Sequence, residues 1–186
     1  MIMKERPHGQ ILNDAGILLF SPMSERIACR KAAEDTCQAL RGVHRHLTKV
    51  FADAKLRALI DIRVSRINGC AYCLDLHTTE ARHPGESPQR VDCLAAWPEA
   101  PSFTGRERAA LAWAEAVTPV AETRAPDEVY AEVKKHFSDK EPVDLTVAIA
   151  MINAWNRLSV AFHSEPKGRK LYRLPKSARM DVRENH

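Results

Sequence analysis

Two cysteines and a histidine lie close together in the chain, at Cys70, Cys73 and His77. On an α-helix each residue turns the chain by about 100°, so these three side chains would share one face. Two thiols one turn apart can form a disulfide, because helical Cα atoms three residues apart fall within the roughly 4.4–6.8 Å that this bond accepts. An imidazole four residues after Cys73 can take up or return its proton. The pattern therefore predicts a redox-active thiol pair with a base beside it.

Which of the two thiols attacks first stays open from the sequence. The thiolate is the reactive form of cysteine, and a helix N-terminus stabilises it. With Asn68 as the predicted N-cap of a helix over 69–82, Cys70 lies in the first turn and gains most from this effect. Cys73 lies further along the helix but next to His77. In either order the second thiol resolves the first, and an external dithiol must reduce the resulting Cys70–Cys73 disulfide.

Other uses of the cysteines are weaker predictions. The spacing Cys-x2-Cys-x3-His supplies three zinc ligands, and His44 or His46 could add another, but no second pair completes a tetrahedral site. Free cysteines are also often small buried hydrophobes, although chance rarely adds a histidine at the helical offset. The other cysteines, Cys29, Cys37 and Cys93, have no neighbours at useful spacing. We therefore predict that the protein uses neither a metal nor a cofactor.

The composition predicts one soluble globular protein. The chain has 186 residues, of which 45% are hydrophobic and 28% charged, enough for a single domain with a core. The net charge of +4 is confined to residues 165–186, so the rest is neutral and we expect no nucleic-acid partner. No run approaches the ~18 apolar residues of a membrane span, and the N-terminus lacks a secretory pattern. These features predict a cytoplasmic protein with no membrane partner, whose Cys-x-x-Cys serves chemistry rather than structure.

Residues 23–164 are predicted to form one all-α domain, preceded by an extension over 1–22 and followed by a basic tail over 165–186. Apolar residues recur at helical spacing, and no alternating pattern of convincing length predicts a strand. Thr104 and Glu107 fit a capping box at a helix start. The expected helices cover 24–50, 54–67, 69–82, 88–95, 104–117, 127–137 and 143–162.

A faint internal repeat accompanies these helices. Asn68 is followed by His77, and Asn153 is followed by His163 at nearly the same distance, each after an apolar helix. The second copy has no thiols. The repeat is compatible with an old duplication of a helix pair, although by itself it is weak support.

The stretch from Val64 to His77, followed by Ala81-Arg82, resembles the core of the alkylhydroperoxidase D / carboxymuconolactone decarboxylase superfamily. The similarity extends from about Met23 to Phe162. It includes Trp97 and the segments 106–111 and 152–157. In this context the signature Cys-x-x-Cys-x-x-x-His is far more specific than an isolated Cys-x-x-Cys.

This resemblance implies an all-α fold and a homo-oligomer, commonly a trimer or a hexamer. Thiol members of the family reduce peroxides through a cysteine pair that maps onto Cys70 and Cys73. The family's histidine maps onto His77, where it helps to deprotonate the second cysteine. A nearly all-apolar helix over 54–67 agrees with oligomerisation, because it indicates more hydrophobic surface than one small domain hides.

The sequence departs from the family at one position of the proton relay. The family usually has a glutamate twelve residues before the first cysteine, and this chain has Ala58 there. Asp61, one turn further along, is the candidate replacement, although it could equally be an exposed or salt-bridged carboxylate. His44, His46 and Glu115 are further candidates from other helices. Without a replacement, peroxidase activity should be low, since one positioned acid–base group contributes about 10²–10⁴-fold.

The sequence thus predicts a thiol-dependent peroxidase or disulfide oxidoreductase that reduces hydroperoxides and is reset by an external dithiol. One alternative is a cofactor-free decarboxylase or lactone-converting enzyme, which needs no thiol pair, so Cys70 and Cys73 count against it. Another is a non-catalytic oligomeric stress-response module whose relay has decayed, for which Ala58 is the best support.

Overall fold

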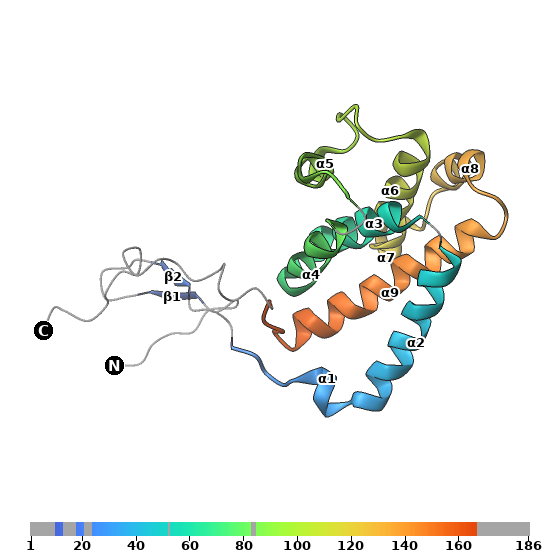
Figure 1. Ribbon diagram of the computed structural model, residues 1–186. Helices are drawn as coiled ribbons and strands as arrows, with labels where there is room; N and C mark the ends of the chain where they lie inside the picture. Colours follow the sequence, from blue (N-terminus) through green and yellow to red (C-terminus); the bar gives the residue numbers. More distant parts are fainter. Residues whose placement is uncertain (1–9, 13–17, 21–23, 52, 83–84, 167–186) are drawn as a thin grey trace, which may run out of the picture.

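The computed structural model describes residues 10–12, 18–20, 24–51, 53–82 and 85–166. Helices build the body of the molecule, with α3 at its centre and α4, α6 and α9 packed around it (Figure 1). The helices are α1 (Cys29–Ala32), α2 (Glu34–Val50), α3 (Ala54–Ile67), α4 (Ala71–Ala81), α5 (Pro88–Cys93), the 3₁₀ helix η1 (Leu94–Ala96), α6 (Gly105–Val117), α7 (Val120–Thr123), α8 (Asp127–His136) and α9 (Glu141–Ala161). The predicted all-α class is confirmed for this domain.

Much of the predicted N-terminal extension and of the basic tail lies outside the described residues. Within 1–22 the structure describes two short strands, β1 (Gln10–Leu12) and β2 (Leu18–Phe20), which pair antiparallel with Ile11 opposite Leu19. The sequence did not predict this pair, because three residues are too few to show an alternating pattern. The division of the chain into extension, domain and tail stays a prediction.

Helix α3 is central because its sequence is apolar on nearly every side. The predicted range 54–67 is confirmed, and its carboxylate cap is Asp53, which accepts the Leu56 N–H at 2.9 Å. Burying each large aliphatic side chain stabilises the fold by about 1.5–3 kcal/mol. The α3 side chains that are at most 1% exposed include Leu56, Leu59, Ile60, Ile62 and Val64.

The junction between α3 and α4 differs from the prediction at the cap. Asn68 is not the N-cap of the second helix but ends α3 in a right-handed helical conformation. Gly69 follows with φ +64°, a left-handed conformation that favours glycine at a helix end. Because Asn68 and Gly69 form the end of α3, the next helix begins later than predicted. Its N-cap is Cys70.

The single long helix predicted over 24–50 is also wrong. It is divided into α1 and α2 at Ala33, whose φ of −131° is not helical. Residues before α1 instead bind the end of α9, where the Arg26 N–H donates to the Phe162 carbonyl at 3.0 Å. Competition from this long-range pairing explains why Ser24 does not cap a helix. The break brings α1 and α2 beside the C-terminal half of α9 (Figure 1).

The predicted capping box at Thr104 and Glu107 is confirmed, with both of its hydrogen bonds present at the start of α6. Helices α8 and α9 agree closely with the predicted ranges, whereas the four-residue α7 was not predicted. In the described part of the chain, none of the helices combines the length and the apolar character needed to cross a bilayer.

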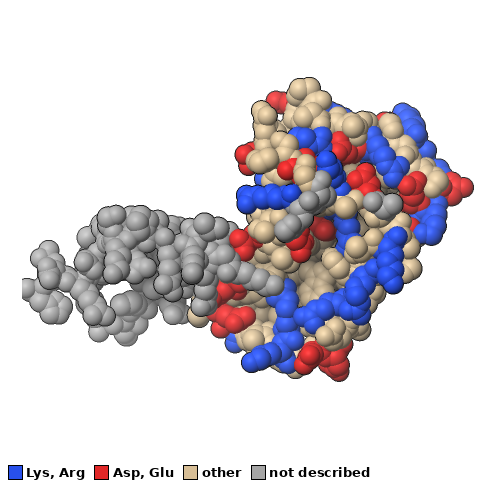
Figure 2. Space-filling model, in the orientation of Figure 1, with Lys and Arg blue, Asp and Glu red and all other residues tan. Residues whose placement is uncertain are grey.

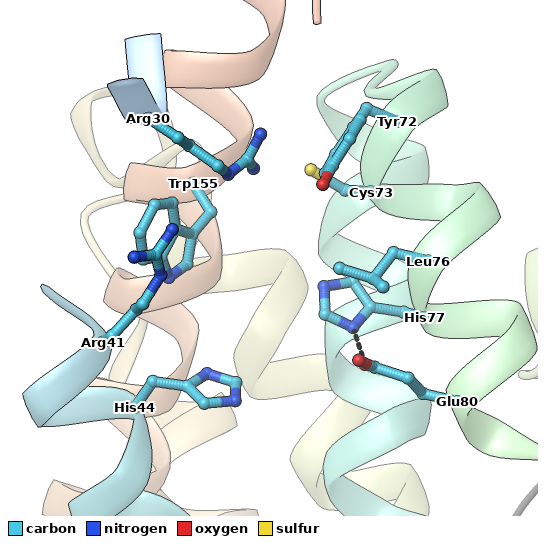
Figure 3. Close-up of a pocket in the computed structure, with 9 residues that line it drawn as sticks. All are labelled: Arg30, Arg41, His44, Tyr72, Cys73, Leu76, His77, Glu80 and Trp155. Atoms are coloured by element: carbon cyan, nitrogen blue, oxygen red, sulfur yellow. Dashed lines mark hydrogen bonds and ion pairs between the residues drawn. The ribbon is translucent and has the colours of Figure 1, made fainter. Parts of the chain in front are cut away.

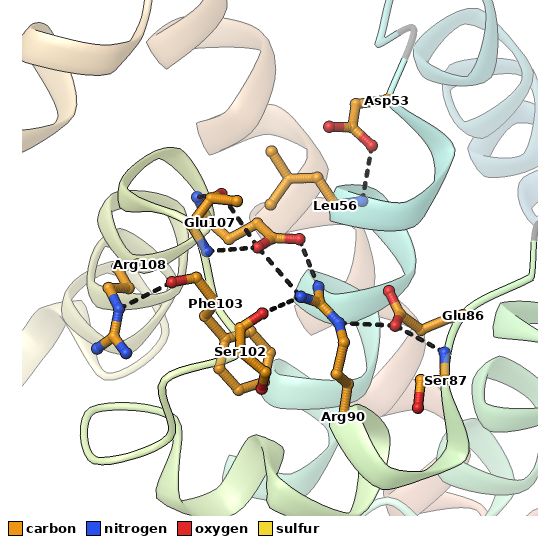
Figure 4. Close-up of polar contacts among 10 residues, drawn as sticks. Asp53, Leu56, Glu86, Ser87, Arg90, Ser102, Phe103, Glu107 and Arg108 are labelled. Atoms are coloured by element: carbon orange, nitrogen blue, oxygen red, sulfur yellow. Dashed lines mark hydrogen bonds and ion pairs between the residues drawn. The ribbon is translucent and has the colours of Figure 1, made fainter.

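A buried ion cluster ties the α5 region to α6 (Figure 4). Arg90 donates to the Glu86 carboxylate at 2.8 Å and also binds Glu107 and the carbonyl of Ser102. Its guanidinium also lies 4.8 Å from the centroid of the Phe103 ring. These contacts hold the connection between α4 and α6 in place, so that α4 keeps its position against α3.

Candidate functional site

A cavity of about 310 Å³ lies between two walls of helices (Figure 3). Helix α4 forms one wall, and α1, α2 and α9 form the other. The side chains from α4 are Tyr72, Cys73, Leu76, His77 and Glu80, and those opposite are Arg30, Arg41, His44 and Trp155. Cys73 and His77, two of the three residues in the predicted thiol site, thus line one cavity together.

Cys70 lies behind this cavity and is only 1% exposed. Its sulfur accepts the backbone N–H of Cys73 at 3.3 Å, as the N-cap of α4. The hydrogen bond from the Cys73 side chain is the largest influence on Cys70. Together with bonds from the Cys73 backbone, Ser159 and Asn156, it outweighs burial and lowers the pKa of Cys70 to about 7. Cys70 is therefore the thiol that holds negative charge near neutral pH.

Cys73 has the opposite electrostatic character. Its hydrogen bond to the Cys70 sulfur, supported by burial, raises the pKa of the Cys73 thiol well above its ordinary value. Its sulfur nevertheless points into the cleft between the two walls, as Figure 3 shows. Both cysteines are buried, Cys70 at 1% and Cys73 at 2% exposed, but of the two it is Cys73 that lines the cavity.

His77 is buried one turn below Cys73 and is held by two carboxylates. Its Nδ1 lies 2.9 Å from Oε2 of Glu80 and 3.8 Å from Oδ2 of Asp61. Burial by itself would lower the pKa of the imidazole, but the negative charges of Asp61 and Glu80 and the bond to Glu80 outweigh it and raise that pKa. The site therefore favours a histidine that takes up a proton.

Asp61, the candidate replacement for the family's glutamate, is buried and faces His77. It also lies 3.9 Å from Arg57, so of the alternative of an exposed or salt-bridged carboxylate the structure has the salt-bridged form. Burial raises its pKa, although the positive charges of His77 and Arg57 oppose this effect. Ala58 lies beside it and helps to line a second cavity of about 270 Å³, together with Asp61 and His77.

Glu80 is a site residue that the sequence reasoning missed. It follows His77 by three residues, a spacing that places two side chains next to each other on a helix, and this signal could have found it. The hydrogen bond from His77 is the main reason that the pKa of Glu80 is lowered. Glu80 is thus a charged partner of the imidazole at the far end of the cavity from Arg30 (Figure 3).

The other candidates for the proton relay differ in their distance from the cavity and in their partners. His44 lines the same cavity and its Nδ1 lies 2.8 Å from the Arg57 guanidinium, and burial, followed by the charge of Arg57, lowers its pKa. His46 is exposed on α2. Glu115 accepts hydrogen bonds from Arg63 at 2.8 Å and from Trp97 at 2.6 Å, so its carboxylate is engaged away from His77.

Buried amides connect the two halves of the internal repeat. Asn68 donates to the side-chain oxygen of Asn153 at 3.0 Å and to that of Asn156 at 2.8 Å. Asn156 in turn donates to the Ser65 hydroxyl at 3.1 Å. Since Asn156 also bonds Cys70, this network fixes the start of α4 against α9.

No cluster of three or more His, Cys, Asp or Glu side chains within the described residues is arranged to hold a metal ion. The thiol site comprises Cys70, Cys73, the His77 imidazole and the carboxylates beside it, and His44 is a second imidazole in the same cavity.

Comparison with known proteins places this geometry in a family. Residues 36–116 match the model of the carboxymuconolactone decarboxylase family. The uncharacterised protein YdfG of Bacillus subtilis is 39% identical over 75% of this chain and 95% of its own length. A structure from Agrobacterium tumefaciens, a protein of unknown function provisionally assigned to antioxidant defence as AhpD, is 41% identical. It matches 77% of this chain and 98% of its own with a TM-score of 0.75.

A more distant relative shares the fold alone. The debrominase Bmp8 is 21% identical, with a TM-score of 0.67 over 74% of each chain. The family match and the two similar proteins agree with the thiol signature and the helical architecture. The chain therefore belongs to the alkylhydroperoxidase D / carboxymuconolactone decarboxylase superfamily.

Proposed function

We propose that the protein is a thiol-dependent peroxidase that reduces hydroperoxides through Cys73 and Cys70 and is reset by an external dithiol. One observation carries the proposal: Cys73 lines a cavity beside His77, while a second sulfur of lowered pKa, Cys70, lies directly behind it. An attacking thiol, a base and a resolving thiolate are thus within about two turns of helix. The similarity to an AhpD-like protein of antioxidant defence supports the same assignment.

In the first step Cys73 attacks the terminal oxygen of the hydroperoxide. His77 accepts the thiol proton, the S–O bond forms as the O–O bond breaks, and the leaving alkoxide takes the proton as an alcohol. The products are Cys73 sulfenic acid and one alcohol. Asp61 and Glu80 act through His77, because their negative charges stabilise the imidazolium that exists while it holds the proton.

In the second step the Cys70 thiolate attacks the sulfur of the Cys73 sulfenic acid. The S–S bond forms, the S–O bond breaks, and the hydroxide leaves as water after it gains a proton. An external dithiol then reduces the disulfide by thiol–disulfide exchange and is itself oxidised, which returns both cysteines to the thiol form. The cycle needs no cofactor, since all the electrons come from the dithiol.

Exposed apolar side chains support the further proposal of a homo-oligomer, a trimer or a hexamer. Val143 is 62% exposed and Val147, one turn later on α9, is 38% exposed. Val120 and Tyr130 are also exposed. A subunit interface over these side chains would remove their apolar surface from water. Sedimentation equilibrium would show the number of subunits, and a monomer at micromolar concentration would refute this part.

The peroxidase proposal is tested by turnover of cumene hydroperoxide with dithiothreitol as the reductant. Cys73→Ser and Cys70→Ser should each lose at least about 10²-fold in rate, because each removes an electron-donating sulfur. Cys93→Ser is the matched control, since Cys93 is exposed and lies outside the cavity. Undiminished turnover in Cys73→Ser would refute the mechanism. Mass spectrometry of the 70–73 peptide after peroxide treatment should show loss of two free thiols.

A further inference from the structure

The wall of the cavity that faces Cys73 carries two arginines that the thiol chemistry does not use. Arg30 comes from α1 and Arg41 from α2, and both side chains lie on the same side of the cleft in Figure 3. Figure 2 shows a band of Lys and Arg side chains beside a hollow in this face of the molecule. One wall of the cavity is thus cationic, and the other carries the thiol and the imidazole.

Arg41 has no partner that would explain its position. Among the residues that the structure describes, no carboxylate or hydrogen-bond acceptor binds its guanidinium. It is nevertheless half-buried, whereas Arg45, one turn later on the same helix, is exposed and lines no part of the cavity. A half-buried guanidinium without a counter-ion is costly, because charged groups lose hydration there. A bound anion would offset this lost hydration, because it gives the guanidinium a charged hydrogen-bond partner.

Arg30 is held in place without a carboxylate as well. Its guanidinium lies 4.3 Å from the centroid of the Tyr72 ring and 5.6 Å from that of Trp155. Its hydrogen bond to the Ser159 hydroxyl is long, at 3.5 Å. Stacking uses the faces of the guanidinium and leaves most of its N–H donors at the edge, where a planar carboxylate can accept them.

The other residues that line the cavity indicate the chemistry of the rest of the ligand. Tyr72 and Trp155 supply apolar surface beside the arginines, and Leu76 supplies more toward the end that holds Glu80 (Figure 3). Glu80 lies at that far end and would repel an anion, although its charge is partly balanced by His77. A ligand with one negative group therefore orients with that group toward the arginines and with its apolar body against the aromatic rings.

We propose that the substrate is a carboxylate-bearing organic hydroperoxide whose carboxylate binds Arg41, assisted by Arg30, while its apolar body lies against Trp155 and its peroxide reaches Cys73. This assignment deepens the proposed peroxidase function and depends on it for the reacting group. The anion-binding part depends only on the two arginines, so it can be measured separately.

The test compares cumene hydroperoxide with its para-carboxylate analogue, using uncharged dithiothreitol as the reductant. The wild-type protein should have a kcat/KM at least about tenfold higher for the carboxylate, the size of one charged hydrogen bond. Arg41→Gln should remove about tenfold of this preference, measured as the ratio of the two kcat/KM values within each variant. Arg45→Gln, the matched control, should behave as wild type. Equal kcat/KM values for both hydroperoxides in the wild type would overturn the proposal.

A binding measurement separates this proposal from the peroxidase assignment. Titration calorimetry of reduced wild-type protein should show that 4-isopropylbenzoate binds at least about tenfold more tightly than 4-isopropylbenzyl alcohol, and Arg41→Gln should abolish the difference. If neither hydroperoxide is turned over, the peroxidase function fails and this measurement still decides the anion site. Equal binding of the two probes overturns that site.

The negative group could also belong to the reductant rather than to the hydroperoxide. A second series therefore replaces dithiothreitol with dimercaptosuccinate, a dithiol that carries carboxylates. If Arg41→Gln changes the KM for dimercaptosuccinate only, and leaves the preference between the two hydroperoxides intact, the assignment to the substrate is overturned.

Discussion

Two ion clusters in this protein use similar residues in different roles. In one, Glu86 and Glu107 both bind Arg90 on the connection between α4 and α6. In the other, Asp61 and Glu80 both lie near His77, beside two cavities. The first cluster has a cation that is always charged, and the second has one whose proton can leave.

Comparing the two clusters shows which features separate a candidate catalytic site from a structural ion pair. An arginine between two carboxylates holds its proton at any ordinary pH, so it can only fix geometry. The pKa of His77 is raised by its two carboxylates against the effect of burial, so this histidine can gain and lose a proton beside the Cys73 thiol. Paired charge and one buried carboxylate, Glu86 or Asp61, are common to both clusters, so neither property by itself indicates catalysis. The cavity and the titratable cation together do.

The largest expected effect comes from removing that titratable cation. His77→Asn should lower peroxide turnover by about 10²–10⁴-fold, because the base for Cys73 is lost. Thermal unfolding should change little, since asparagine can still bond Glu80. His46→Asn, on an exposed face of α2, is the control and should keep full activity. Steady-state kinetics checks the rate, and an active His77→Asn would remove the distinction between the clusters.

The second prediction concerns the structural cluster. Arg90→Met should destabilise the fold by about 3 kcal/mol, because it leaves Glu86 and Glu107 buried without their cation. The rate per folded molecule should stay close to that of the wild type. Urea unfolding measures the first quantity, and Arg45→Met provides the control for loss of an exposed arginine. If Arg90→Met instead lost most of its rate and kept its stability, the Arg90 cluster would be functional rather than structural.

The sequence predicted which face of the helix carries the candidate residues better than where that helix begins. Helical periodicity was enough to place Cys73 and His77 on one face, since that relation depends only on the turn per residue. It could not show that Gly69 takes a left-handed conformation and makes Cys70 the cap. It also could not show that Arg26 pairs with the end of α9, that the first helix is interrupted at Ala33, or that Arg30 lines the cavity. Both outcomes depend on contacts distant in the sequence.

The third prediction uses the pH dependence of the reaction. Asp61 and Glu80 raise the pKa of His77 against the effect of burial, so the neutral base forms only at higher pH. Asp61→Asn removes one of these charges and should lower that pKa. The acid limb of the kcat/KM profile should therefore move to lower pH, with a loss of rate of about tenfold at its optimum. An unmoved acid limb would mean that Asp61 is structural, as Glu86 is.

The smallest expected effect is a change in the titration of Cys70. Its pKa is lowered to about 7 mainly by the hydrogen bond from the Cys73 side chain. Cys73→Ala removes this bond, so the pKa of Cys70 should rise toward the ordinary value of 9.0. Thiolate absorbance near 240 nm, followed from pH 5 to 10, measures this directly, with Cys93→Ala as the control. A Cys70 that still titrates near neutrality without Cys73 would owe its charge to the cap of α4 and to Asn156 and Ser159. In that case the pKa of Cys70 would not depend on the Cys73 thiol.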